Sequence, residues 1–180
     1  MHAGEDREPS GDPPPRSRPR FSLLGSPWLR AVLVLVFVVV ADQLSKHAVN
    51  ASIVQGEERK FLPGVELVNT RNNGVAFGFL PGSHVAVTIV IGLALVALLV
   101  YFTLHSREKL IWLPTGMLLG GAIGNVADRV RDGSVTDFVK LPLGWPPFNV
   151  ADVSITFGVL ILFLVIDHAR AARRRPAQPS

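Results

Sequence analysis

The stretch FNVADVSITFGVLILFLVI, residues 148–166, carries a single carboxylate, Asp152, at the head of an otherwise apolar run. A run of this length approaches the ~20 residues that a helix needs to cross the hydrocarbon of a bilayer. A charged side chain costs roughly 2.5 to 3.5 kcal/mol at the centre of such a helix on insertion scales, and less near the interface. Asp152 is therefore expected to have a function, and its position sets it at one end of a membrane span.

Three further apolar blocks of similar length precede this one, so that the four blocks are residues 28–48, 84–104, 110–127 and 150–168. The hydrophobic fraction of 48% is high for a soluble protein that also carries polar tails. The pattern predicts a membrane protein, an all-α bundle of four transmembrane helices. We expect three parts: a disordered tail over residues 1–27, a four-span domain over 28–168 and a basic tail over 169–180.

Basic residues flank the blocks on one side of the predicted bundle: Arg16, Arg18, Arg20 and Arg30, then Arg107 and Lys109, then Arg170, Arg173, Arg174 and Arg175. Lys and Arg accumulate on the cytoplasmic side of membrane proteins. Both termini are therefore expected in the cytoplasm, with the loops 49–83 and 128–149 on the outer face. The first loop has strand-like alternation and turn residues, which predict a small β-sheet at the interface. In the second, Trp145 and Phe148 suit the level of the headgroups.

The composition excludes several chemistries. The chain has no cysteine, which removes disulfides, thiolate metal sites and a cysteine nucleophile. The five histidines are scattered and no H-E-x-x-H motif occurs, so we expect no metal, no cofactor and no serine triad. The basic residues lie at the ends of apolar blocks instead of on one face of a soluble module, which argues against nucleic-acid binding.

Polar residues gather where the predicted spans meet the outer loops: Asp42 and Lys46, then Asn125, Asp128 and Arg129, then Asn149 and Asp152, with Asp137 in the second loop. Each group alone has a simpler explanation, such as a snorkelling lysine with its counter-ion, a helix cap or an anchor among headgroups. Because all of them fall at the same outer depth, we interpret them as one site.

Carboxylates are the residues of this set that suit catalysis. Two aspartates held close together cannot both ionise easily, so one keeps a proton as an acid while the other activates water. Such a dyad can hydrolyse a peptide bond without a covalent intermediate.

Five motifs then occur in order along the chain: DQLSK at 42–46, NNGVAF at 72–77, GGAIGNVADR at 120–129, VTDF at 135–138 and FNVAD at 148–152. In these blocks, from about residue 28 to 168, the sequence closely resembles the lipoprotein signal peptidase (signal peptidase II) family of bacterial membrane aspartic proteases. The resemblance implies an endopeptidase that removes signal peptides from prolipoproteins, before a diacylglyceryl-modified cysteine. It also implies a multi-pass protein of the cytoplasmic membrane, without a cofactor, that contacts membrane lipids, acts as a monomer and is sensitive to globomycin.

The resemblance also assigns roles to residues. It makes Asp137 and Asp152 the catalytic pair, and it makes the outer loop 49–83 a cradle-like sheet and the loop 128–149 an interfacial helix. Residues that support the pair or hold the substrate would be Asn72, Asn125, Asp128, Arg129 and Asn149, with Asp42 and Lys46 as a structural pair nearby. The glycines of the third block would let another helix or a bound chain approach closely. The signal helix of the substrate could lie between the spans, where Gly120, Gly121 and Gly124 leave room.

Two other classes of protein remain open from the residues alone. A small transporter or proton-relay protein could line a path with Asp and Lys, but its ionisable groups should be spread through the depth of the bilayer. A non-catalytic membrane scaffold could use the polar groups as anchors.

Overall fold

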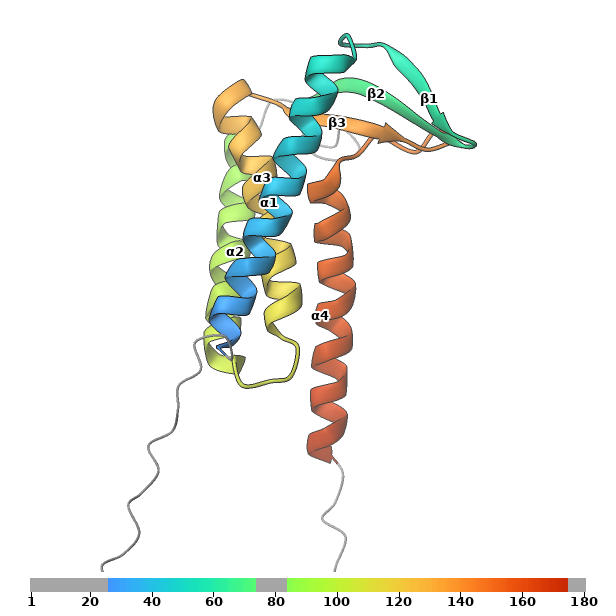
Figure 1. Ribbon diagram of the computed structural model, residues 1–180. Helices are drawn as coiled ribbons and strands as arrows, with labels where there is room; N and C mark the ends of the chain where they lie inside the picture. The colour runs from blue at the N-terminus through green and yellow to red at the C-terminus, as the bar shows by residue number, and fades with distance from the viewer. Residues whose placement is uncertain (1–25, 74–83, 175–180) are drawn as a thin grey trace, which may run out of the picture.

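The computed structural model describes residues 26–73 and 84–174. Within these residues the elements follow the order α1 (Pro27–Ser52), β1 (Glu58–Leu62), β2 (Val65–Asn72), α2 (His84–His105), α3 (Trp112–Asp132), β3 (Val135–Lys140) and α4 (Val150–Arg174). The helices run side by side and the sheet lies across one end of them, while the first turn of α1 and the last turn of α4 lie at the opposite end (Figure 1).

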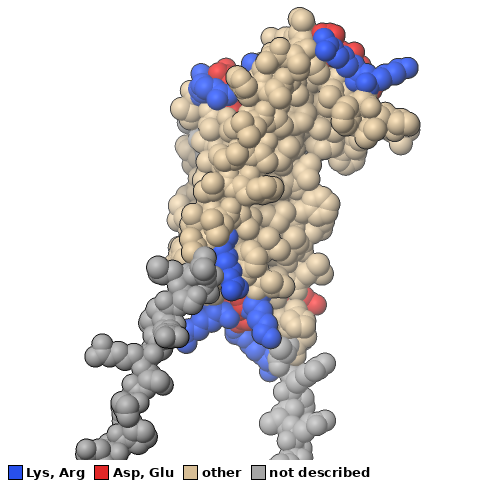
Figure 2. Space-filling view, viewed as in Figure 1, with Lys and Arg blue, Asp and Glu red and all other residues tan. Residues whose placement is uncertain are grey.

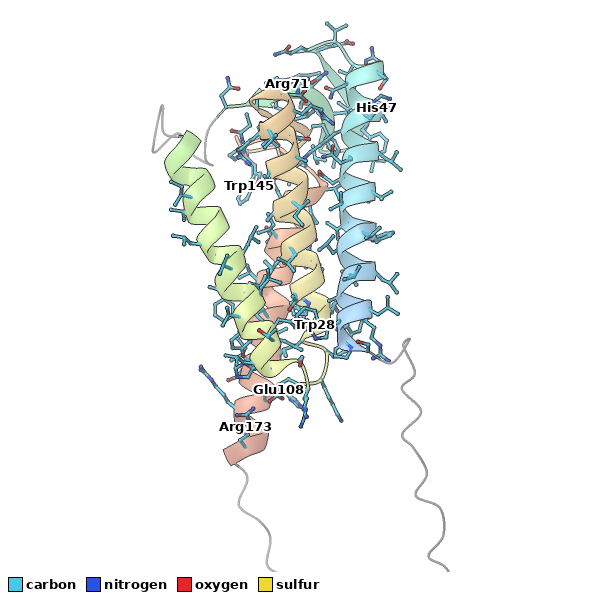
Figure 3. All side chains as sticks on the ribbon, turned by 90° about the vertical axis from the view of Figure 1, so that its left-hand side faces the viewer. Trp28, His47, Arg71, Glu108, Trp145 and Arg173 are labelled. Atoms are coloured by element: carbon cyan, nitrogen blue, oxygen red, sulfur yellow. The ribbon has the colours of Figure 1, made fainter. Side chains whose placement is uncertain are left out.

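Helix α3 is the centre of the bundle. It packs on both α1 and α4 along its length, whereas α2 packs mainly on α3 and meets α1 where Phe102 contacts Trp28. In a second view α3 lies between α1 and α2 (Figure 3). Glycines allow this close approach. A Cβ atom at Gly120 would lie 2.8 Å from Val38 Cβ of α1, and one at Gly121 would lie 2.6 Å from the carbonyl oxygen of Ala151 in α4.

The glycines of α3 therefore do not leave room for a substrate helix, as we expected for Gly120, Gly121 and Gly124. The third of them, Gly124, faces Asp42 of α1, whose Oδ2 would lie 2.5 Å from an added Cβ. Close approach of another helix at these glycines is thus confirmed, whereas the prediction of room for a substrate is wrong because α1 and α4 themselves fill the space beside each glycine.

Two helices are long and apolar enough to cross a membrane by length and composition: Pro27–Ser52, and Val150–Ala171 of α4. Their large apolar side chains face outward, Phe37 and Phe163 being 72% and 68% exposed. On the face drawn in Figure 2, charged side chains gather at the two ends of the molecule and the surface between them is uncharged. At about 1.5 Å per residue, α2 (22 residues) and α3 (21 residues) are also about as long as the hydrocarbon is thick. The four-span arrangement stays a prediction.

The helix ends differ from those expected. Helix α1 continues to Ser52, α3 continues to Asp132 before Gly133 ends it with φ 72°, and α4 continues to Arg174, inside the expected basic tail. Some polar residues beyond the apolar blocks are therefore helical. The backbone hydrogen bonds of a helix can continue past the last apolar side chain, because they do not depend on whether the side chains are apolar.

The predicted β-sheet is present, with a third strand that we did not expect. Strands β1 and β2 form an antiparallel hairpin, and β3 pairs antiparallel with β2, in the order β1-β2-β3. The described residues of the loop 128–149 contain this strand and no interfacial helix, so that expectation is wrong. The physical reason is that VTDFV alternates and is rich in β-branched residues, and β2 offers it an edge to pair with. Residues 74–77 of the NNGVAF motif lie outside the described residues.

Small apolar clusters hold each end of the bundle. At the sheet end Val49, Ile53 and Phe138 are buried together, with Leu67, Val139 and Val150 packed around them. At the other end Ala31, Phe102 and Ile111 form a second cluster. The first cluster fixes β3 against α1 and the start of α4, which positions the polar residues described next.

Candidate active site

Asp137 and Asp152 come together at the sheet end, one from β3 and the other from the first turn of α4. The side chain of Asn149 lies between them. Its Nδ2 donates to Asp137 Oδ1 at 2.7 Å, while its backbone N–H donates to Asp152 Oδ2 at 3.2 Å. One residue therefore holds both carboxylates of the expected pair, and it is fully buried.

Asn149 also caps helix α4. Its Oδ1 accepts the backbone N–H of Asp152 at 2.9 Å, and Asp152 returns a bond to the backbone of Asn149, which makes a reciprocal capping box. The two prolines before it, Pro146 and Pro147, cannot continue a helix backward. A carboxylate in the first turn is also favoured by the helix dipole. The capping bonds between Asn149 and Asp152 therefore hold the Asp152 side chain in one orientation at the start of α4.

Asp137 is 3% exposed and is the buried member of the pair. Its Oδ2 accepts a hydrogen bond from Asn72 Nδ2 of β2 at 2.9 Å. The pKa of Asp137 is raised to about 6, chiefly by burial and also by the negative charge of Asp152, while the amides of Asn72 and Asn149 oppose the rise. A carboxyl group with this pKa keeps its proton up to about pH 6, where an ordinary aspartate is ionised.

Asn125 of α3 links the pair to the bundle. Its Nδ2 donates to Asp152 Oδ1 at 2.9 Å, and its Oδ1 accepts from Asn149 Nδ2 at 3.1 Å. The same oxygen accepts from Lys46 Nζ at 3.0 Å. Two candidate site residues from the sequence, Asn125 and Asn149, therefore form one continuous amide network with both aspartates.

Beneath this network lies a buried ion cluster. Lys46 Nζ is 2.7 Å from Asp42 Oδ2 and 2.8 Å from Asp128 Oδ2, and all three side chains are at most 1% exposed. The i,i+4 pair expected on α1 is confirmed, and Asp128 joins it from α3. The other oxygen of Asp42 accepts the backbone N–H of Ala151 at 2.9 Å. The cluster therefore binds α1, α3 and the N-terminus of α4 together.

Three further contacts of Asp128 were not anticipated from the sequence. Its Oδ1 accepts from Gln43 Nε2 at 2.9 Å and lies 3.4 Å from Arg131 Nη2, and the backbone N–H of Thr136 donates to its Oδ2 at 3.4 Å. Gln43 lies within the DQLSK motif, next to Asp42, and this adjacency was the available signal. No such signal existed for Thr136, because its contact with Asp128 depends on the position of strand β3.

Two expected residues stand apart from the pair. Arg129 is half-buried and donates to the backbone oxygen of Asn125 at 3.2 Å, with no bond to either carboxylate among the described residues. Gly121 serves the contact of α3 with α4, as described above. Asn72, Asn125, Asp128, Asn149, Asp42 and Lys46 are all brought together as expected. Within residues 26–73 and 84–174, no three His, Asp or Glu side chains are grouped so as to hold a metal ion.

The sequence was compared with known protein families. Residues 34–167 match the family described as signal peptidase (SPase) II. The chain belongs to the signal peptidase II family.

Curated relatives carry the same description. The chain is 37% identical over 155 residues to the lipoprotein signal peptidase of Paraburkholderia phymatum, covering 82% of this chain and 90% of the relative. It is 33% identical over 135 residues to that of Halothermothrix orenii, covering 74% and 92%, and 32% identical over 141 residues to that of Staphylococcus aureus strain MRSA252, covering 76% and 86%.

Two solved structures share the fold. Both are described as bacterial membrane enzymes studied by the in meso method, at 2.3 Å and 1.9 Å resolution. The first has a TM-score of 0.73 and 31% identity, covering 83% of this chain and 94% of the other. The second has a TM-score of 0.67 and 32% identity, covering 76% and 91%. The chain is thus a bacterial membrane protein of a protease family.

Proposed function

We propose that this chain is an aspartic endopeptidase that removes the signal peptide from prolipoproteins, by hydrolysis immediately before a diacylglyceryl-modified cysteine. One observation carries the aspartic mechanism: Asn149 donates to Asp137 at 2.7 Å from its side chain and to Asp152 at 3.2 Å from its backbone. The negative charge of Asp152 also raises the pKa of Asp137, so the two carboxylates interact as the members of an aspartic dyad do. The names of the relatives support the substrate class.

The roles of the two carboxylates follow from their surroundings. Asp152 lies in the first turn of α4, accepts two N–H donors and is partly open to solvent, so it is the ionised group that removes a proton from water. Asp137 is buried and starts the reaction protonated. It gives this proton to the carbonyl oxygen of the scissile bond. As the C–N bond of the resulting tetrahedral intermediate breaks, Asp152 gives the proton it took from water to the leaving amine, and Asp137 takes back a proton from a hydroxyl of the intermediate, which becomes the new carboxyl group. The pair is then in its starting state.

The position of the pair suits a lipid-anchored substrate. Asp152 heads α4, whose apolar side chains below it are exposed to lipid, and Asp137 lies on the sheet above. A peptide bond adjacent to a lipid-modified residue must stay near the membrane surface. We propose that the sheet end faces outward, with both termini in the cytoplasm, four membrane spans and a monomeric enzyme.

The test is processing of a lipid-modified prolipoprotein by the purified protein in detergent. Asp137→Asn and Asp152→Asn should each reduce the rate by at least about 10⁴-fold, as expected when a member of a catalytic unit is lost. Asp132→Asn is the matched control, since Asp132 is an aspartate at the same end of the bundle that pairs with Arg71 and Arg131. Normal cleavage by either dyad variant would refute the aspartic mechanism.

A second measurement separates substrate class from mechanism. Precursor that lacks the diacylglyceryl group should be cleaved poorly, and globomycin should inhibit cleavage of the modified precursor. Equal cleavage of both precursors would show that the acyl chains play no part in recognition.

A further inference from the structure

A cavity lies at the tip of the sheet, away from the two aspartates. It has a volume of about 590 Å³ and is formed where the β1–β2 turn meets the chain that follows β3. Its walls are mostly apolar and include Phe61, Leu62 and Pro63 on one side and Leu141, Pro142 and Leu143 on the other. This volume is within the roughly 300 to 1,000 Å³ that is usual for sites that bind small molecules.

The apolar side chains around this cavity are exposed. Phe61 and Leu62 are 61% and 58% exposed, and Leu143 is fully exposed. Leu143 also has a φ of 68°, a left-handed conformation that is uncommon for a bulky side chain. Trp145, two residues on, is 60% exposed. A strained leucine pointing away from the protein, beside other apolar groups, indicates a surface covered by lipid instead of water.

The charged side chains of the sheet, unlike these exposed apolar ones, are mostly joined in ion pairs. Lys140 Nζ bonds Glu58 Oε2 at 2.6 Å and lies 3.5 Å from Glu66 Oε2, so one residue from each strand takes part in a charge ladder on one face. In Figure 2 charged side chains gather along the upper rim of the sheet, and the surface below them is uncharged on this face. The remaining lysine of the cavity wall, Lys60, makes no ion pair within the described part of the chain.

We propose that this cavity binds an anionic phospholipid of the adjacent leaflet, with an acyl chain against Phe61, Leu62 and Leu143 and the phosphate on Lys60. Glu66 lies opposite Lys60 in the β1–β2 register and also lines the cavity, but its carboxylate is 3.5 Å from Lys140 Nζ. The combination of an apolar trough with a lysine at its edge that makes no ion pair within the described residues matches a lipid whose tail and phosphate are joined. The surface continues the lipid-facing side of the protein, because β3 leads from Asp137 to the cavity wall at Lys140. A bound lipid would hold the sheet, and with it Asp137, at a constant height over the membrane.

The experiment uses the fluorescence of Trp145, the tryptophan nearest this cavity in sequence. Trp28→Phe and Trp112→Phe leave Trp145 as the single tryptophan, and the full chain is reconstituted in nanodiscs of phosphatidylcholine. A small fraction of brominated phosphatidylglycerol or brominated phosphatidylcholine is then added as the quencher. Brominated phosphatidylglycerol should be about fivefold more effective at low fractions, the equivalent of about 1 kcal/mol per Lys near an anionic surface.

Two variants test the residue assignment. Lys60→Gln should abolish the preference for phosphatidylglycerol, and Lys60→Arg should keep it. Arg59→Gln is the matched control, because Arg59 is on the same strand, pairs with Glu57 at 2.8 Å and does not line the cavity. An equal loss in Arg59→Gln would overturn the proposal in favour of general charge attraction, as would equal quenching by the two lipids in the parent protein.

Competition distinguishes the possible occupants. Glycerol phosphate should leave the quenching unchanged, and relief of quenching by it would show a simple phosphate site instead of a lipid site. A diacylglyceryl-modified peptide should also leave it unchanged, and displacement of the brominated lipid by that peptide would assign the cavity to the substrate. None of these readouts depends on peptidase activity, so their failure is separable from failure of the proposed function.

Discussion

Lys46 and Asn125 are joined by a hydrogen bond of 3.0 Å, from the Nζ of the lysine to the Oδ1 of the amide. The Nδ2 of the same amide donates to Asp152 at 2.9 Å. A buried cation therefore polarises the amide toward donation, and the amide passes this effect to the candidate catalytic carboxylate. The ion cluster beneath the dyad thus supports the bundle and, through Asn125, helps to position Asp152.

Lys46→Met should destabilise the protein strongly. It leaves Asp42 and Asp128 buried without their shared cation, and removal of one partner from a buried ion pair costs roughly 3–5 kcal/mol. The measurement is the unfolding transition of the purified protein in detergent. Lys140→Met is the control, because it removes an exposed ion pair with Glu58, and it should leave the transition almost unchanged. Equal transitions in the two variants would contradict the importance of the buried cluster.

Asn149→Ala should lower both stability and activity. Loss of a helix cap costs about 1 kcal/mol, with a range of 0.5–2. The same change also removes the donor that holds Asp137, and misplacement of a reacting group by about 1 Å can cost 10²-fold in rate. Asn149→Ser is the informative companion, because serine can cap α4 but cannot reach Asp137 as the longer amide does. It should regain most of the stability and little of the activity, whereas recovery of both would show that the cap alone matters.

Gly121→Ala should disturb the contact between α3 and α4. The added Cβ would lie 2.6 Å from the carbonyl oxygen of Ala151, a backbone atom that can move only with the helix that carries Asp152. Overpacking of this kind costs typically 1–3 kcal/mol. Gly92→Ala is the matched control in α2, where an added Cβ meets nothing within 4 Å and helix propensity improves. The thermal unfolding temperature and the cleavage rate should both fall for Gly121→Ala. Both should stay at or above the parent values for Gly92→Ala.

Local periodicity predicted part of this site correctly. The i,i+4 spacing of Asp42 and Lys46 and the cap of Asn149 on Asp152 are contacts within one helix or its first turn, so spacing along the chain determines them. The common depth of the polar groups also follows from the ends of the apolar blocks. These features needed no knowledge of how the helices pack.

Apart from the helix ends, the errors concern contacts between segments distant in the chain. Asn125, Asp128 and Arg129 share a broad helix face, and only the packing of α3 on α1 decides that Asp128 meets Lys46 while Arg129 does not. The strand β3 has six residues and depends on β2 for its hydrogen bonds. The sequence likewise allowed either a helix or a bound chain beside Gly121, and the fold places α4 there. Such outcomes are set by tertiary packing.

The pH dependence of cleavage should reflect Asp137. Its pKa is raised from the usual 3.8 to about 6, so the pair holds one proton below that value and loses it above. Because the acid role needs that proton, kcat/KM should decline as pH rises through an apparent pKa that belongs to the coupled pair. The sign for stability is the same: a raised carboxyl pKa favours the folded state at low pH, and this contribution is lost as pH rises through the folded value.

Asn72→Leu should move the alkaline limb of this profile to higher pH. The amide of Asn72 donates to Asp137 at 2.9 Å and so favours its ionised form, and without that donor the carboxyl group holds its proton more tightly. The measurement is kcat/KM for a lipid-modified precursor on both sides of pH 6, with binding of substrate kept below saturation. Asn73→Leu is the control, since Asn73 is the exposed neighbour at the end of β2. A shift to lower pH in Asn72→Leu, or the same shift in Asn73→Leu, would show that Asp137 does not carry the proton that limits cleavage.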